Sequence, residues 1–342
     1  MKSRIDWIDI SRGYGILLVM LGHLWHSNLI YSFHIPAFFF LSGFTHSTPK
    51  PNSSIGNLLI RRIKSILVPY FSLGAVMLIF TWTWMFLSKS HSFSLNDYTT
   101  IIADFLLQKR MWTLWFLSCL FILNILFHAI LVYTGNRKTR IISLTFILPI
   151  LILLYYKSGG PPMVWNVDAS IMALPFYSAG YLICQHKITE KIFRQSGLTQ
   201  FFIFIVFTFS NIIFLALNIH ITGECLEMYS SKYAFLPFTY ISAISGTLAL
   251  IIFSKHSNNK VIRYIGINSM VFFAWHQTIA MPLLDLAYKK MGVFHIKYSS
   301  HFAKSERNII TLFGMLAMLA IANEIIKKFN WSIFTGLDRA KK

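Results

Sequence analysis

The feature that most constrains this chain is a succession of apolar runs, each close to the length needed to cross a lipid bilayer. A transmembrane helix needs about 20 mostly apolar residues. The composition agrees, because 55% of the 342 residues are hydrophobic and only 13% are charged, about half the charge of a soluble domain. The sequence therefore predicts an all-α, polytopic membrane helix bundle.

We predict about ten transmembrane helices. Their starts lie near Ile8, Leu29, Ile66, Trp112, Ile141, Ala169, Phe201, Ala234, Ser269 and Ile309. Together they form a single membrane domain over residues 1–342, with spans from about residue 8 to about residue 326 and no appended soluble domain. With a cytoplasmic N-terminus, about 20 lysines and arginines fall on the cytoplasmic side and about 10 on the outer side. Both termini are therefore predicted in the cytoplasm. The longest connections, 87–110, 157–168 and 288–308, then face outward.

The formal net charge of +19 does not indicate a nucleic-acid partner. The basic residues fall between apolar runs, where they set topology and contact anionic lipid, so we expect membrane lipid and no nucleic acid. The three cysteines, Cys119, Cys184 and Cys225, show no disulfide or zinc-site spacing, and we expect no metal.

The first apolar run contains Asp9, Arg12 and His23. Ionisable groups inside a membrane are costly and by default indicate a functional site. Arg12 and His23 are eleven residues apart, nearly three helical turns, so they share one helix face roughly 16 Å apart along the axis. The alternative is an arginine that reaches the membrane surface and a histidine that bonds a neighbouring helix.

The second run is short, and we expect Pro36 and Gly43 to interrupt it. Such breaks are tolerated where a cavity satisfies the backbone. His34 lies just before the proline, in the outer half together with His23. The two histidines could form an acid–base pair or a hydroxyl-binding site, although His34 alone could equally be a structural donor.

Arg61, Arg62 and Lys64 precede the third span on its cytoplasmic side. Such clusters often only anchor a helix, but with Arg12 on the same side they could bind a phosphate-rich cytoplasmic ligand. Asp168 follows a glycine- and proline-rich outer segment. It could be a helix N-cap, or it could orient an imidazole or a sugar hydroxyl. We interpret His276, in the ninth span, as a packing or gating residue.

Six segments together resemble the integral-membrane acyltransferase family three, which includes O-antigen and peptidoglycan O-acetyltransferases. They are DISRGYGILLVMLGH, FHIPAFFFLSGF, RRIKSILVPY, LWFLSCLF, ALPFYSAGYLI and YIGINSMVFFAWH, and they occur in family order over nearly the whole chain. The resemblance implies a ten-helix domain that moves an acyl group, usually acetyl, from cytoplasmic acyl-CoA to a carbohydrate hydroxyl.

The resemblance also implies roles for particular residues. The required arginine and histidine, with ten residues between them, correspond to Arg12 and His23. The basic pair before the third helix usually consists of two arginines, whereas here the second position is Lys64, which keeps the charge but loses the bidentate fork. Some members carry an extracytoplasmic esterase-like domain. We expect no such domain here, and the membrane domain is then expected to complete the transfer.

These observations lead to one hypothesis and two alternatives. The hypothesis is O-acetylation of a lipid-linked or lipopolysaccharide sugar in the bacterial inner membrane, with acetyl-CoA as co-substrate. His23 acts as base or transient acyl carrier, His34 and Asp168 orient the acceptor or His23, and the basic cluster binds CoA phosphates. The alternatives are a transporter or flippase for a lipid-linked sugar, although no inverted repeat is visible, and a structural membrane subunit.

Overall fold

The computed structural model describes residues 5–49, 55–88, 95–292, 301–331 and 335–336. Within these ranges the chain is helical and has no β-strand, apart from an isolated bridge between Glu227 and Lys232. The predicted all-α fold is therefore confirmed. The two chain ends, which the sequence places in the cytoplasm, lie outside the described residues, as do parts of two predicted outer connections, 89–94 and 293–300.

The described residues in the first half of the chain form eight α-helices and a π-helical segment. They are α1 (Asp6–Trp25), α2 (Asn28–Tyr31), α3 (His34–Phe44), α4 (Ile55–Arg62), the π-helix η1 (Ile63–Leu67), α5 (Val68–Ser88), α6 (Leu95–Leu107), α7 (Trp115–Thr134) and α8 (Lys138–Lys157).

In the second half, the residues that the structure describes form further α-helices and three short segments of other helix types. They are the 3-10 helix η2 (Val164–Asn166), α9 (Val167–Met172), α10 (Leu174–Gln185), α11 (Ile188–Phe193), α12 (Gly197–Thr222), the 3-10 helix η3 (Met228–Ser230), α13 (Leu236–His256), α14 (Lys260–Ile267), α15 (Ser269–Trp275), the π-helix η4 (His276–Ala280), α16 (Met281–Met291) and α17 (His301–Lys328).

Six helices in the described part of the chain are long and apolar enough to cross a membrane. They are Ile55–Leu87, Trp115–Thr134, Lys138–Lys157, Gly197–Thr222, Leu236–His256 and Ser305–Lys328. A seventh span results if α9 and α10, bent by 56° at their junction, cross together. The other predicted spans, starting near Ile8, Leu29 and Ser269, correspond to α1, to α2 with α3, and to α15 with α16. The second and third of these spans are interrupted, and α1 carries a buried charged residue.

The break in the second predicted span lies before His34 and not at the two positions that the sequence indicates. Pro36 lies in the first turn of α3. Backbone N–H groups in a first turn have no intrahelical acceptor, so the N–H that proline lacks costs the helix no hydrogen bond. Gly43 lies inside the helix, and a Cβ there would approach the carbonyl oxygen of Tyr177 in α10 to 1.9 Å. Gly43 is therefore a close-packing position between α3 and α10.

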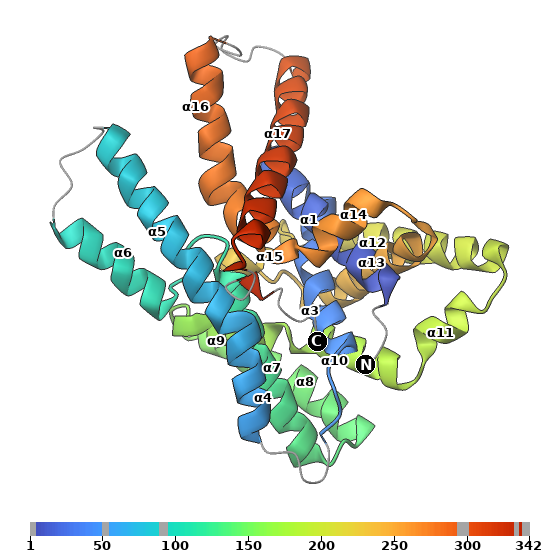
Figure 1. Cartoon of the computed structure of the whole chain (residues 1–342). Helices are drawn as coiled ribbons and strands as arrows, with labels where there is room; N and C mark the ends of the chain where they lie inside the picture. Colours follow the sequence, from blue (N-terminus) through green and yellow to red (C-terminus); the bar gives the residue numbers. More distant parts are fainter. Residues whose placement is uncertain (1–4, 50–54, 89–94, 293–300, 332–334, 337–342) are drawn as a thin grey trace.

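Helix α1 lies in the core of the bundle, where it packs against α3, α13, α14 and α15 (Figure 1). Its contact with α14 is close, because a Cβ on Gly266 would lie 1.7 Å from the carbonyl oxygen of Asp9. The paired ribbons α5 with α6 and α16 with α17 extend away from this core (Figure 1). The residues of α1 are thus surrounded by helices from both halves of the sequence.

Candidate functional site

The turn after α1 brings the two predicted histidines to one place. Helix α1 ends at Trp25, and His26 adopts the left-handed conformation, with φ 49° and ψ 47°. Since this conformation ends a helix, the chain turns back through α2 into α3. His23 occupies the last turn of α1 and His34 the first position of α3. Both side chains line the same cavity.

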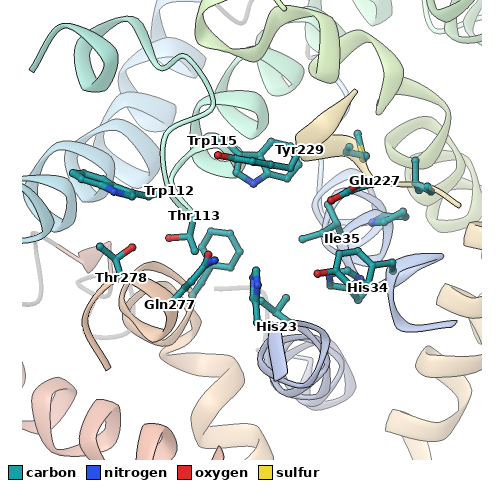
Figure 2. A pocket seen from close by; sticks show the side chains of 16 residues that line it. His23, His34, Ile35, Trp112, Thr113, Trp115, Glu227, Tyr229, Gln277 and Thr278 are labelled. Atoms are coloured by element: carbon teal, nitrogen blue, oxygen red, sulfur yellow. The ribbon is translucent and has the colours of Figure 1, made fainter. Parts of the chain in front are cut away.

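This cavity has a volume of about 370 Å³ and is built from four separate parts of the chain (Figure 2). They are the segment from α1 to α3, residues 112–115 before α7, residues 226–229 after α12, and Phe273 with Gln277 and Thr278 around the start of η4. Figure 2 shows His23 pointing into the space between these walls. The cavity therefore depends on the tertiary fold and on no single motif.

The cavity walls combine aromatic faces with a few polar groups. Trp112, Trp115 and Tyr229 supply aromatic surface. The polar groups besides the histidines include Thr113, Glu227, Gln277 and Thr278. A mostly apolar cavity with a few placed hydrogen-bonding groups is the usual form of a site for an organic molecule. Among the described residues, no cluster of three or more His, Cys, Asp or Glu side chains is arranged to hold a metal ion.

The hydrogen bonding of His34 fixes which ring nitrogen can accept a proton. Its Nδ1 lies 2.7 Å from the carbonyl oxygen of Ile30, and a carbonyl oxygen only accepts. Nδ1 therefore carries the hydrogen, and in the neutral ring Nε2 carries the lone pair. The ring also packs edge-on against Tyr31, with 5.2 Å between the ring centroids. His34 is thus held rigidly at the cavity wall.

His276 lies directly behind His23. The two ring centroids are 5.1 Å apart, although the residues are separated by most of the chain. His276 is completely buried, and the residues that follow it, Gln277 and Thr278, line the cavity. Sequence reasoning singled out His276 but gave it a packing or gating role, because a span's position in the sequence does not show which helix it faces.

Arg12 lies away from the cavity, toward the other end of α1. Its guanidinium is 3.7 Å from the carboxylate of Asp9, whose side chain is only 3% exposed. The ion pair with Arg12 helps to explain how α1 tolerates a buried acid. Roughly 16 Å of helix separates Arg12 from His23.

The predicted basic cluster also lies at that end. Arg61 and Arg62 end α4, and Lys64 lies in the π-helical segment η1. The charges of both arginines act on buried His46, which follows the end of α3 opposite to His34. Because α3 has 11 residues, this end is roughly 16 Å from the cavity. The cluster and the cavity therefore occupy opposite ends of the core.

Asp168 lies behind the cavity wall. It is fully buried at the start of α9 and accepts hydrogen bonds from Arg110 and Tyr156. Arg110 in turn donates to the carbonyl oxygens of Met228, at 2.9 Å, and Tyr229, at 2.6 Å. Both of these residues line the cavity. Asp168 therefore influences the cavity indirectly, because it holds Arg110, which in turn holds the backbone of the loop before α13.

Sequence reasoning did not find Arg110, the aromatic residues of 112–115 or the 226–229 wall. The aromatic run MWTLWF directly after Arg110 was a usable signal, because tryptophans beside a predicted outer connection often contact ligands or the membrane interface. The loop after α12 has no comparable pattern.

The comparison with known families decides the class of the protein. The sequence profile described as an acyltransferase domain, that of acyltransferase family 3, matches residues 5–323. The chain belongs to acyltransferase family 3. No curated protein and no solved structure gave a match. The family resemblance seen in the six sequence segments is therefore confirmed, and the match includes every residue of the cavity and of the basic cluster.

Proposed function

We propose that this chain is a membrane O-acetyltransferase that moves an acetyl group from cytoplasmic acetyl-CoA to a hydroxyl of a lipid-linked or cell-surface sugar, such as one in O-antigen. Family membership supports a membrane acyltransferase. The observation that carries the finer proposal is the position of His23, whose imidazole faces a cavity with aromatic and hydroxyl-bearing walls (Figure 2).

The cavity suits a sugar acceptor. The faces of Trp112, Trp115 and Tyr229 offer apolar contact to a sugar ring, and threonine, glutamine and glutamate side chains offer partners for its hydroxyls. His34 would present the lone pair of Nε2 to a hydroxyl. In this proposal Asp168 orients the acceptor indirectly, since Arg110 connects it to the cavity wall.

The donor would approach from the other end of the core. Arg61, Arg62 and Lys64, with Arg12, would bind the phosphates of acetyl-CoA by charge-assisted hydrogen bonds. The pantetheine arm would extend along α1 so that the thioester reaches His23. This arrangement requires the basic cluster to face the cytoplasm. The ten-span topology that we propose for a bacterial inner membrane, with both termini in the cytoplasm, meets this requirement.

Two routes fit this geometry. In direct transfer, His23 takes the proton of the sugar hydroxyl, the oxygen attacks the thioester carbonyl carbon, the C–S bond breaks, and the CoA thiolate recovers the proton. In a relay, a nitrogen of His23 attacks the thioester carbonyl carbon, the C–S bond breaks, and CoA leaves as the thiolate. The sugar hydroxyl oxygen then attacks the acetyl carbon, the bond from the acetyl group to His23 breaks, and the hydroxyl proton goes to the thiolate. Both routes require an unprotonated nitrogen of His23 that faces the cavity.

The test combines a purified enzyme with whole cells. Protein in lipid nanodiscs is supplied with acetyl-CoA, and CoA release is measured with a thiol reagent. In parallel, mass spectrometry compares surface polysaccharide from cells with the wild-type chain and with the His23→Ala variant. We expect CoA release and a mass increase of one acetyl group, both dependent on His23. Lipid-linked sugar that crosses vesicles without either signal would instead identify a transporter and overturn the proposal.

A further inference from the structure

His276 is a buried imidazole whose hydrogen bonds leave one nitrogen available. Its Nδ1 lies 2.8 Å from the carbonyl oxygen of Phe273 and 3.2 Å from that of Phe272. Carbonyl oxygens only accept, so Nδ1 carries the hydrogen. In the neutral ring, Nε2 then holds a lone pair. Among the described residues, this buried Nε2 has no hydrogen-bond partner.

The backbone around His276 holds the ring in place. His276 is the first residue of the π-helical turn η4, and π-turns shift the backbone hydrogen bonds and are frequent at functional sites. The His276 ring bonds carbonyls of the preceding turn, while Thr113 donates to the carbonyl of Ala274 at 2.8 Å. These bonds restrict the movement of the imidazole.

The imidazole of His23 packs against that of His276. The centroids of the two imidazoles are 5.1 Å apart and their planes differ by 42°. His276 does not line the cavity, whereas His23 does. His23 therefore lies between His276 and the space in which the acceptor would bind. A centroid separation of 5.1 Å is short enough for one N–H of His23 to reach Nε2 of His276 when the two rings turn toward each other.

We infer that His276 is a positioning residue that accepts a hydrogen bond from His23 and so holds the other nitrogen of His23, unprotonated, toward the cavity. A buried partner that fixes the tautomer of a catalytic imidazole is a general device, most often a carboxylate or a carbonyl. Here the acceptor is a second imidazole. The inference rests on the proposed acetyltransferase function, and it holds for direct transfer and for the relay.

The tautomer also determines where the proton moves. When the cavity-facing nitrogen takes the hydroxyl proton, His23 becomes an imidazolium with N–H groups on both sides. One of them donates to the lone pair of His276, which stabilises the positive charge, and the other returns its proton to the CoA thiolate. His276 neither gains nor loses a proton in this cycle, so the overall reaction stays the same.

Two substitutions at His276 separate hydrogen bonding from packing. His276→Gln can place an amide oxygen near the position of Nε2 and so keeps an acceptor for His23, whereas His276→Leu removes that acceptor. Phe272→Leu is the matched control, since the Phe272 side chain is also fully buried one turn earlier and the substitution leaves the backbone carbonyl near His276 in place. For each variant, kcat and the KM for acetyl-CoA are measured in nanodiscs, together with the thermal unfolding temperature.

We expect His276→Leu to lower kcat roughly 10- to 100-fold with little change in KM, and His276→Gln to recover most of the loss. In a His23→Ala background, His276→Leu should have no further effect on the residual rate, because residues that act as a unit are not additive. A wild-type kcat in the leucine variant, an equal loss in the glutamine variant, or an additive loss in the double variant would each overturn the inference.

The two proposals can fail separately. If the wild-type enzyme transfers no acetyl group, the proposed function fails. If the wild type transfers acetyl and the His276 variants behave like the Phe272→Leu control, only the role of His276 fails.

Discussion

The carboxylate of Asp168 and the guanidinium of Arg110 form an ion pair whose side chains are 0% and 8% exposed. Arg110 uses its other terminal nitrogen to hold the carbonyl oxygens of Met228 and Tyr229. One buried carboxylate in α9 therefore determines where the loop before α13 lies over the cavity. This gives Asp168 an influence on the cavity without direct contact.

Replacing Asp168 with asparagine should disturb that loop. The variant leaves the charge of Arg110 buried without its counterion, a change that typically costs about 3–5 kcal/mol in a buried pair. We expect a lower unfolding temperature and a raised KM for the acceptor, with the KM for acetyl-CoA unchanged. Initial rates against each substrate and thermal unfolding in detergent check this.

The matched control is Asp285→Asn. Asp285 pairs with Arg307 between α16 and α17, but the two side chains are 49% and 31% exposed. An exposed pair contributes about 0–1 kcal/mol, so this variant should behave like wild type. Equal effects of the two substitutions would show that Asp168 has no special role at the cavity.

The helical fold and one wall of the cavity could be predicted because they depend on residues that are close together in the sequence. His23 and His34 are eleven residues apart in the sequence, so one turn between two helices is enough to bring them together. The ionisable groups of α1 were visible because the membrane makes them costly. These predictions needed only periodicity, composition and short spacings.

The remaining walls could not be predicted because they depend on contacts between distant segments. His276 lies beside His23 only because α15 packs against α1, and a single sequence contains no information on that pairing. The wall at 226–229 belongs to an irregular connection held by Arg110. Hydrophobic periodicity does not determine the path of such a connection.

The basic cluster gives a prediction about the donor. Substituting both Arg61 and Lys64 with glutamine should weaken acetyl-CoA binding more than tenfold, because a charge-assisted phosphate contact contributes roughly 1.5–3 kcal/mol. The protein should still fold in the membrane. Isothermal titration of the nanodisc-embedded protein with CoA measures the affinity.

A control of equal charge comes from α8. Lys138 and Arg140 are exposed at the start of that helix, on the same predicted side, and their double glutamine variant removes the same charge. It should bind CoA nearly as well as wild type. If both double variants bind equally, Arg61 and Lys64 only anchor the helix.

The contact between α3 and α10 gives a prediction about stability. A Cβ at Gly180 would lie 2.0 Å from the carbonyl oxygen of Phe40, so Gly180→Ala must push the two helices apart. Overpacking of this kind costs about 1–3 kcal/mol. Gly197→Ala serves as the control, since in the described part of the chain nothing beyond the glycine's chain neighbours and the nearby backbone of its own helix lies within 4 Å of the added methyl group. We expect a lower unfolding temperature only for Gly180→Ala, and an unchanged temperature there would contradict the close packing.

The distribution of basic residues gives a prediction about topology. A reporter fused after Lys342 should be active only if it functions in the cytoplasm, since cytoplasmic connections carry the excess of lysine and arginine. Paired fusions with a cytoplasmic and an extracytoplasmic reporter measure this directly. Activity of the extracytoplasmic reporter would overturn the ten-span arrangement and would place the basic cluster on the side without acetyl-CoA.

His23 gives the most direct prediction about chemistry. We expect His23→Ala to abolish acetyl transfer while expression and membrane insertion stay near normal, because removing a polar group from an apolar helix does not hinder insertion. A positioned base contributes roughly 10²- to 10⁴-fold to the rate, so the loss should be large. His23→Gln keeps a hydrogen-bond donor and acceptor but cannot take a proton. If the glutamine variant retains most of the activity, His23 is neither base nor acyl carrier. The role would then pass to His34, whose Nε2 is the other imidazole nitrogen available at the cavity wall.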